Sequence, residues 1–188
     1  MPRKYIPNLV VENAELRFKN FAGLAGKFNR EGDRNFCLLL NRPDIDVDQM
    51  VEDGWNVKML KPREGYEDEG MTPYIQVAVS YKYENKAPKI VFVTSNGKNQ
   101  IPQDLVAAVD FLEMVKCDVT INPSPWEVDG NRGIKAYLKT MYITIREDPL
   151  DVKYADVPES SYMALESSGE PLQITDGNDD IYVEFEER

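Results

Sequence analysis

Apolar and polar side chains alternate over most of the first 145 residues, and this period of two restricts the fold more than any other feature. The run 74–83 is the clearest case, since Ile75 and Val77 share one parity and Gln76 takes the other. Such alternation predicts strands with one face in a core and one face in solvent. We expect strands at residues 14–21, 35–40, 55–59, 74–83, 89–95, 115–121, 126–128 and 133–145.

Turn and helix signals lie between these strands. Asn96-Gly97 and Asp129-Gly130 are hairpin-turn dipeptides, and the slip of apolar parity after Lys139 predicts a β-bulge near Thr140. Helices are expected only at 43–53, where acidic residues stand near the start and Gly54 follows the end, and at 102–114. The second segment is predicted to be a helix because its apolar residues recur at helical spacing.

Many short strands, two short helices and no βαβ alternation predict a mainly β fold. The architecture we favour is an OB-fold-like β-barrel, that is, an oligonucleotide-binding barrel, with inserted loops. A β-sandwich with a helix is the alternative. Residues 1–150 would form this domain, and residues 151–188 would follow it as a tail.

The charge is unevenly distributed along the chain. The formal net charge is −11, but residues 151–188 hold eleven acidic and two basic side chains, a balance of −9 that leaves −2 for residues 1–150. Residues 1–42 carry eight basic and four acidic side chains. The C-terminal segment is rich in Ser, Gly and Pro and poor in apolar residues, which predicts a largely disordered, flexible acidic tail.

Composition excludes several kinds of chemistry. The chain has no histidine, so catalytic triads and metal sites that use histidine are absent. Cys37 and Cys117 stand in apolar stretches and are expected to be buried, reduced thiols. Clustered acids at 44–48 and 67–69 fit a helix start and a loop better than a nuclease site. We therefore expect no enzyme activity, no metal and no cofactor.

Targeting signals are also missing from the sequence. No apolar run is long enough for a membrane span, and the start, Met-Pro-Arg-Lys, has no signal-peptide core. We expect a cytoplasmic protein without membrane partners, and the residues leave open whether it forms homo-oligomers.

Aromatic rings stand among long cations on two strands and one loop. This arrangement suits single-stranded nucleic acid, because unpaired bases stack on rings while phosphates pair with cations. Solvated strand faces and edge lysines are the ordinary alternative. The candidate DNA-binding residues are Arg17, Lys19 and Phe21, then Lys27, Phe28, Arg30 and Arg34, then Lys58, and finally Lys135, Tyr137 and Lys139.

Other aromatic residues receive a different interpretation. Phe36, Trp55, Tyr81 and Tyr83 share parity with aliphatic residues, so they are expected in the core, and Phe18 is expected to point inward with Leu16. Trp126, between Pro125 and Glu127, fits either location.

The end of the tail mixes acids with apolar residues, a composition suited to a partner with a basic groove and an apolar pocket. Its candidate partner-binding residues are Asp179, Asp180, Ile181, Tyr182 and Phe185. Because the tail is tethered, we expect it to compete with DNA for the cationic surface and to dock replication or recombination proteins when DNA displaces it. A solubilising tail without a partner is the alternative.

Several segments together resemble the phage-encoded single-stranded DNA-binding proteins. They are Phe21-Ala22-Gly23, the segment 28–36, Asp53-Gly54-Trp55-Asn56-Val57-Lys58 and the segment 133–139, and Asp179-Asp180-Ile181 is similar to the acidic tip of bacterial counterparts. The resemblance implies an OB fold with an acidic tail and sequence-tolerant coating of strands during DNA replication, recombination or repair, without catalysis. Bacterial tips end on Pro-Phe, whereas this chain continues through Val183 to Arg188.

Two other functions remain open at this point. The acidic surface would also fit a DNA mimic or inhibitor that binds a host nucleic-acid-binding protein. A phage structural or assembly module would show no binding of single strands.

Overall fold

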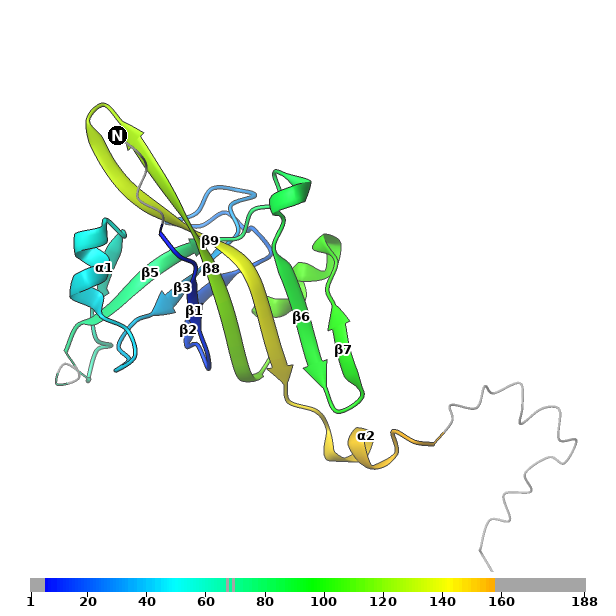
Figure 1. Cartoon of the computed structure of the whole chain (residues 1–188). Coiled ribbons are helices and arrows are strands. Elements are labelled where there is room, and N and C mark those ends of the chain that lie inside the picture. The colour runs from blue at the N-terminus through cyan, green and yellow to red at the C-terminus, as the bar shows by residue number, and fades with distance from the viewer. Residues whose placement is uncertain (1–5, 67, 69, 158–188) are drawn as a thin grey trace, which may run out of the picture. The chain divides into compact units, whose positions relative to one another are not determined.

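The computed structural model describes residues 6–66, 68 and 70–157 (Figure 1). Contacts within the chain divide it into Met1–Val152 and Lys153–Arg188, and every described strand belongs to the first unit. The strands are β1 (Leu9–Val11), β2 (Leu16–Asn20), β3 (Asn35–Leu39), β4 (Val57–Leu60), β5 (Thr72–Ala78), β6 (Lys89–Thr94), β7 (Gly97–Gln100), β8 (Met114–Val128) and β9 (Asn131–Ile145). The helices are α1 (Val47–Asp53), α2 (Pro149–Lys153) and two 3₁₀ segments, η2 (Glu84–Lys86) and η3 (Gln103–Asp110). The prediction of a mainly β fold with one or two short α-helices is confirmed.

One open, mixed sheet contains all nine described strands, and six of them follow the order β1-β8-β9-β5-β3-β2. The β4 strand also pairs with β5, and the β6–β7 hairpin joins through β6 to β9. Among the described strand pairs, β5–β9 and β6–β9 are parallel and the others are antiparallel. In Figure 1, α1 lies on the left near β5, and β6 and β7 lie on the right. Within the described residues β1 and β2 end the order without pairing with each other, so closure into an OB-type barrel stays a prediction.

The long β8–β9 hairpin organises the sheet. Sequence patterning divided β8 into two strands because Pro123 and Pro125 interrupt it, but β1 pairs with β8 only as far as Ile121. Beyond that residue no described strand pairs with this edge of β8, so a proline there removes no ladder bond to a described strand on that side. Thr120 pairs with Thr140 while Ile121 pairs with Leu138, which leaves Lys139 as an extra residue. The predicted bulge near Thr140 is confirmed.

The two predicted helices have different outcomes. Helix α1 is confirmed, with the Asp46 carboxylate accepting the Gln49 N–H at 3.0 Å and Gly54 ending the helix at a φ of 96°. The second is the shorter 3₁₀ segment η3, which buries Val106 and Val109.

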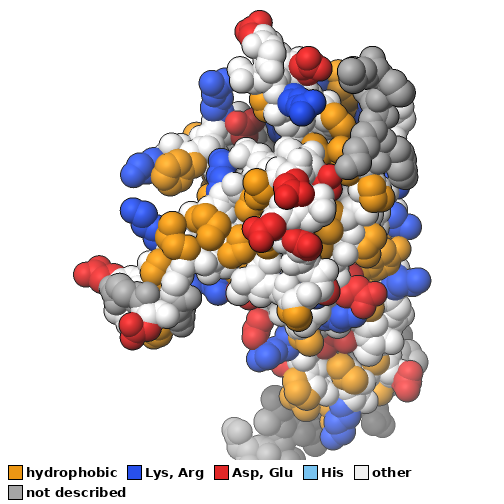
Figure 2. Space-filling model, turned by 60° about the vertical axis from the view of Figure 1, so that its left-hand side comes forward, with side chains coloured by type: hydrophobic (Ala, Val, Ile, Leu, Met, Phe, Trp, Pro, Cys, Tyr) orange, Lys and Arg blue, Asp and Glu red, His pale blue; other side chains and the backbone are white. Residues whose placement is uncertain are grey.

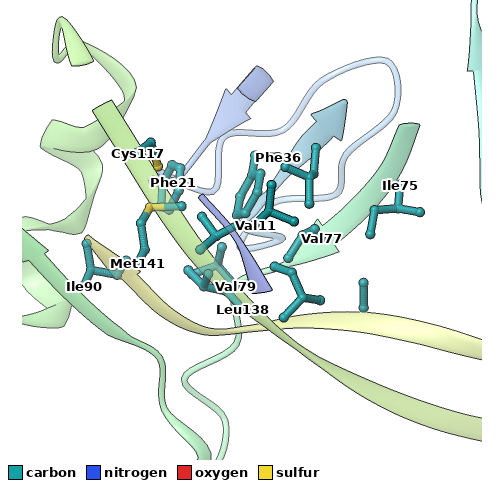
Figure 3. Packing of buried hydrophobic residues seen from close by; sticks show 14 of the residues in the cluster. Val11, Phe21, Phe36, Ile75, Val77, Val79, Ile90, Cys117, Leu138 and Met141 are labelled. Atoms are coloured by element: carbon teal, nitrogen blue, oxygen red, sulfur yellow. The ribbon is translucent and has the colours of Figure 1, made fainter. Parts of the chain in front are cut away.

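The core is formed by the apolar faces of the strands, which meet as shown in Figure 3. Phe21 and Phe36 are fully buried there, with their rings stacked at a centroid distance of 5.6 Å. Trp55 is also in the core, as predicted, and Tyr81 is half-buried. Tyr83 is 57% exposed, so its predicted burial was wrong, because β5 ends at Ala78 and the strand pattern does not continue to residue 83.

The face assignment on β2 was also wrong. Arg17 pairs with Cys37 but Asn20 pairs with Asn35, so three steps on β2 match two on β3. Phe18 occupies this bulge with a φ of +49° and is 67% exposed, although its parity predicted an inward side chain. A bulge inserts one residue into the alternation and reverses the faces that follow it. Phe21 consequently points into the core and cannot stack on DNA.

Both cysteines are free thiols. Cys117 is buried, and burial raises its pKa to about 12, while Cys37 is half-buried with its pKa raised by the same cause. Among the described residues, no helix combines the length and apolarity needed to cross a membrane.

Candidate nucleic-acid interface

A cleft of about 340 Å³ lies between the loop 21–34 and the outer part of the β8–β9 hairpin. Phe28 from the loop and Trp126 from β8 both line it, and their side chains are 84% and 45% exposed. Gln76 and Ala78 of β5 also line it. The cleft therefore presents two accessible rings beside a polar surface of the sheet, which is a form that can hold flat aromatic ligands.

The loop that carries Phe28 is fixed by polar contacts at its base. The Asn20 side chain donates to the carbonyl oxygens of Leu24 (3.0 Å) and Asp33 (3.1 Å) and accepts the Leu24 N–H (2.9 Å). The Asp110 carboxylate of η3 accepts the N–H groups of Phe21 and Ala22, each at 2.8 Å. These bonds hold both ends of the loop against the body of the domain.

A second hollow, the channel, continues from the cleft and has a volume of about 420 Å³. Arg34, Ala78 and Lys135 line both, and the channel adds Lys82 and Tyr137. The two hollows thus adjoin and together form a groove that runs past the end of β5 and the first half of β9.

Two cations are held beside rings in this groove. The Arg34 Nε donates to the Phe21 carbonyl oxygen at 2.9 Å, and its guanidinium carbon lies 5.6 Å from the centre of the Tyr81 ring. The ammonium of Lys135 lies 5.2 Å from the centre of the Tyr137 ring. A cation over an aromatic face keeps its charge available to an anion while its position is restrained.

The surface carries charges of both signs. Figure 2 shows one face on which acidic side chains lie in the middle, at the top, at the left-hand tip and at the lower right, with Lys and Arg side chains also around the edges. In the groove itself, Arg34, Lys82 and Lys135 stand against Asp33, the acidic residue that lines both hollows. The groove is therefore cationic within a chain whose net charge is −11.

The sequence matches a known family along nearly its whole length. Residues 1–187 match the family described as "Putative phage ssDNA-binding domain". The chain belongs to this family. Membership of this family indicates that the ligand is single-stranded DNA. No curated protein matches the sequence.

Three solved structures of the single-stranded DNA-binding protein from bacteriophage Enc34 share 14% sequence identity with this family member. The structure in complex with single-stranded DNA aligns with a TM-score of 0.49, covering 76% of this chain and 88% of that one. A C-terminal truncation gives 0.47 with coverages of 76% and 87%, and a further structure gives 0.45 with 76% and 83%.

The fold brings several predicted site residues of this family member together. Phe28, Arg34, Lys135 and Tyr137 line the groove. Lys27 lies on the loop with its ammonium 5.4 Å from the centre of the Phe28 ring, and Arg30 is exposed on the same loop. Lys139 lies beyond the channel, in a third hollow that also includes Tyr137.

Three predicted cations lie away from the groove. Arg17 forms an exposed ion pair with Glu15 at 2.7 Å. The Lys19 ammonium donates to the carbonyl oxygens of Val109 and Leu112 at 3.0 and 3.3 Å, so it caps the end of η3. Lys58 is exposed on β4 opposite Tyr74 and lines neither hollow. With Phe21 in the core, the triplet predicted on the first strand does not form a joint binding face.

Trp126 and Lys82 were not predicted as site residues. Trp126 fitted either location by sequence, and Lys82 was assigned to a continued strand together with Tyr83. The signal was nevertheless present, because Lys82-Tyr83 followed by Lys86 repeats the combination of a ring with cations seen at residues 135–139. The tail residues Asp179, Asp180, Ile181, Tyr182 and Phe185 lie outside the described residues.

Proposed function

We propose that this protein binds single-stranded DNA in the groove formed by the cleft and the channel, with little dependence on base sequence. The observation that carries the proposal is the placement of Phe28 and Trp126 beside Arg34 and Lys135 along one continuous hollow. Rings accept any base face, and cations accept any phosphate.

In this mechanism the bases enter the cleft and stack on Phe28 and Trp126, while Arg34, Lys82 and Lys135 neutralise phosphates. Base stacking on an aromatic side chain contributes about 1–3 kcal/mol per base. Each phosphate contact also releases counterions, so affinity falls as salt rises. The protein would coat exposed strands during phage DNA replication, recombination or repair in the host cytoplasm, acting through an OB-type fold and without catalysing a reaction.

A titration of fluorescent oligothymidylate at two salt concentrations tests this function. Phe28→Ala should weaken binding by about 1–3 kcal/mol, because it removes a stacking surface. Phe111→Ala is a matched control, since Phe111 is 86% exposed and lines neither hollow. Wild-type protein that fails to bind at low salt, or equal losses in the two variants, would contradict the proposal.

The acidic C-terminal segment is proposed to compete with DNA for the groove and to dock replication or recombination proteins. Its support is the charge of −9 in residues 151–188, which has the opposite sign to the charge of the groove. A chain that ends at Val157 should bind oligothymidylate more tightly and with a steeper dependence on salt than the full chain, because salt also weakens the competing contact of the tail. A DNA mimic would instead show no single-strand affinity in either form, and it would lose its protein target on truncation.

A further inference from the structure

A third hollow, the basin, adjoins the channel and has a volume of about 670 Å³. It shares Ser80, Lys82 and Tyr137 with the channel and no residue with the cleft, so it extends the groove away from Phe28 and Trp126. The basin is lined in addition by Tyr83, Lys86, Lys89 and Lys139.

A short 3₁₀ turn arranges the ring of this basin. Tyr83 precedes η2, and the Lys86 N–H donates to the Tyr83 carbonyl oxygen at 3.0 Å. Because residues three apart share a face in a 3₁₀ turn, the side chain of Lys86 lies beside that of Tyr83. The ammonium groups of Lys82 and Lys86 lie 5.4 and 5.9 Å from the centre of its ring. Tyr83 is thus an exposed ring flanked by two cations.

The other two lysines come from neighbouring strands. Lys89 begins β6 and pairs with Thr140 of β9 in the parallel register. Lys139 is the extra residue of the β9 bulge. A bulge redirects a side chain out of the regular alternation, and here Lys139 lines the basin.

The charge of the basin is not balanced by the described part of the protein. No Asp or Glu of the described chain lines it, and none of its four lysines forms an ion pair with another described residue. Four ammonium groups that have no ion-pair partner in the described part of the chain surround one hollow, and in a protein of net charge −11 they fit an anionic ligand. Continuity with the groove and the exposed ring of Tyr83 favour a nucleic-acid strand over an acidic peptide.

We propose that the basin is a second subsite for single-stranded DNA, which extends the strand path from the cleft through the channel. Tyr83 stacks a base, and Lys86, Lys89 and Lys139 contact phosphates. This inference rests on the proposed function, and it sets the length of DNA that one protein molecule covers.

Oligothymidylates of two lengths test the subsite in the full-length protein. One of about 5 nucleotides and one of about 16 bracket the site sizes of single OB folds. Tyr83→Ala should weaken binding of the longer strand about tenfold and leave the shorter strand almost unchanged. Lys86→Gln with Lys89→Gln should lower the salt slope for the longer strand by about 1.4, since each phosphate contact on a single strand contributes about 0.7.

Matched controls separate the subsite from general charge and exposure. Tyr66 is 58% exposed in the loop before β5, and Tyr66→Ala should change neither affinity. Lys61→Gln with Lys98→Gln removes the same charge at exposed positions outside the basin and should leave the slope much closer to the wild-type value. Thermal unfolding of every variant should match the wild type, because all these side chains are exposed.

The outcomes distinguish the subsite from the proposed function itself. If the wild type binds neither strand, the proposed function fails and the subsite fails with it. If Phe28→Ala loses affinity while the basin variants bind the longer strand like wild type, the subsite alone is wrong. Equal losses on both strand lengths would also overturn it. Tighter binding by the basin variants would show that an acidic segment, not DNA, occupies the basin.

Discussion

The indole of Trp126 packs against the backbone of Gly133, its partner across the β8–β9 hairpin. A Cβ atom at residue 133 would lie 3.0 Å from Cζ2 and 3.1 Å from Nε1 of the indole. The absence of a side chain at Gly133 therefore leaves room for the ring that lines one side of the cleft. A glycine inside a strand often marks such a close approach.

Gly133→Ala should move the Trp126 ring without unfolding the protein. The clash falls on a side chain that is 45% exposed and free to shift, so we expect a stability change below about 1 kcal/mol. DNA affinity should fall by up to the loss of one stacking surface, about 1–3 kcal/mol. Tryptophan fluorescence and oligothymidylate titration measure the two effects. Gly26→Ala is the control, because a Cβ there meets nothing within 4 Å.

The Asp110 carboxylate couples η3 to the loop that carries Phe28. Asp110→Ala removes the acceptor for two N–H groups, and hydrogen bonds to charged groups contribute about 1.5–3 kcal/mol each, so the free energy of unfolding should fall by at least about 2 kcal/mol. Asp110→Asn retains one oxygen acceptor and should lie between this variant and the wild type. Faster amide exchange at Phe21 and Ala22 would locate the effect, and unchanged exchange there would refute the coupling.

Phe21 tests the reversed face of β2. Phe21→Ala should destabilise the protein by about 3–5 kcal/mol, because it empties a fully buried site stacked on Phe36. Phe18→Ala, at the exposed bulge, should cost less than about 1 kcal/mol. Chemical unfolding of both variants gives the comparison. A stable Phe21→Ala protein with weakened DNA binding would restore the original sequence interpretation.

Sequence alternation located most strands because burial on one face imposes a period of two wherever pairing is regular. It failed where pairing is irregular. The bulge at Phe18 reversed a face, and nothing in the residues 14–21 marks its position, since it depends on how β2 meets β3. The bulge after Lys139 was predictable because apolar residues continue far enough beyond it to show the changed parity.

The candidate site was predictable in kind but only partly in its members. Lys135 and Tyr137 were predicted from a local pattern on one strand, and both line the groove, while their part in DNA binding stays a prediction. Lys82 and Trp126 enter the groove because β5 ends early and because the β8–β9 hairpin extends past its prolines. Both facts depend on strand pairing between distant segments, which a single sequence does not specify.

Tyr81 carries a hydroxyl that is buried and has no hydrogen-bond partner within the described part of the chain. Burial raises its pKa, although the nearby Arg34 guanidinium opposes the shift. Tyr81→Phe removes a polar group that gains nothing from burial and keeps the ring beside Arg34, so stability should be unchanged or higher by about 1 kcal/mol. Thermal unfolding measures this change in stability, and a clear loss of stability would show that the hydroxyl has a partner.

Asp118 makes the stability of the folded protein depend on pH in the acid range. Its carboxylate accepts the Asn13 N–H at 2.7 Å and lies 3.0 Å from the Lys116 ammonium. Burial by itself raises the pKa of this carboxyl, but the Asn13 hydrogen bond and Lys116 outweigh burial, and the pKa lies below its ordinary value. A carboxyl with a lowered folded pKa stabilises the protein above the unfolded value of about 3.9, and this contribution is lost as pH falls through the folded pKa.

Asp118→Asn keeps an oxygen acceptor for Asn13 but removes the charge. Near neutral pH it should lower the free energy of unfolding by up to about 1 kcal/mol, because the bond to Asn13 becomes neutral. At pH values below the lowered pKa of Asp118 the wild-type carboxyl is also protonated, so the two proteins should converge in acid. Urea unfolding across this pH range measures the difference, with the exposed Glu64→Gln as control. A difference that stays constant with pH would show that Asp118 acts through shape alone.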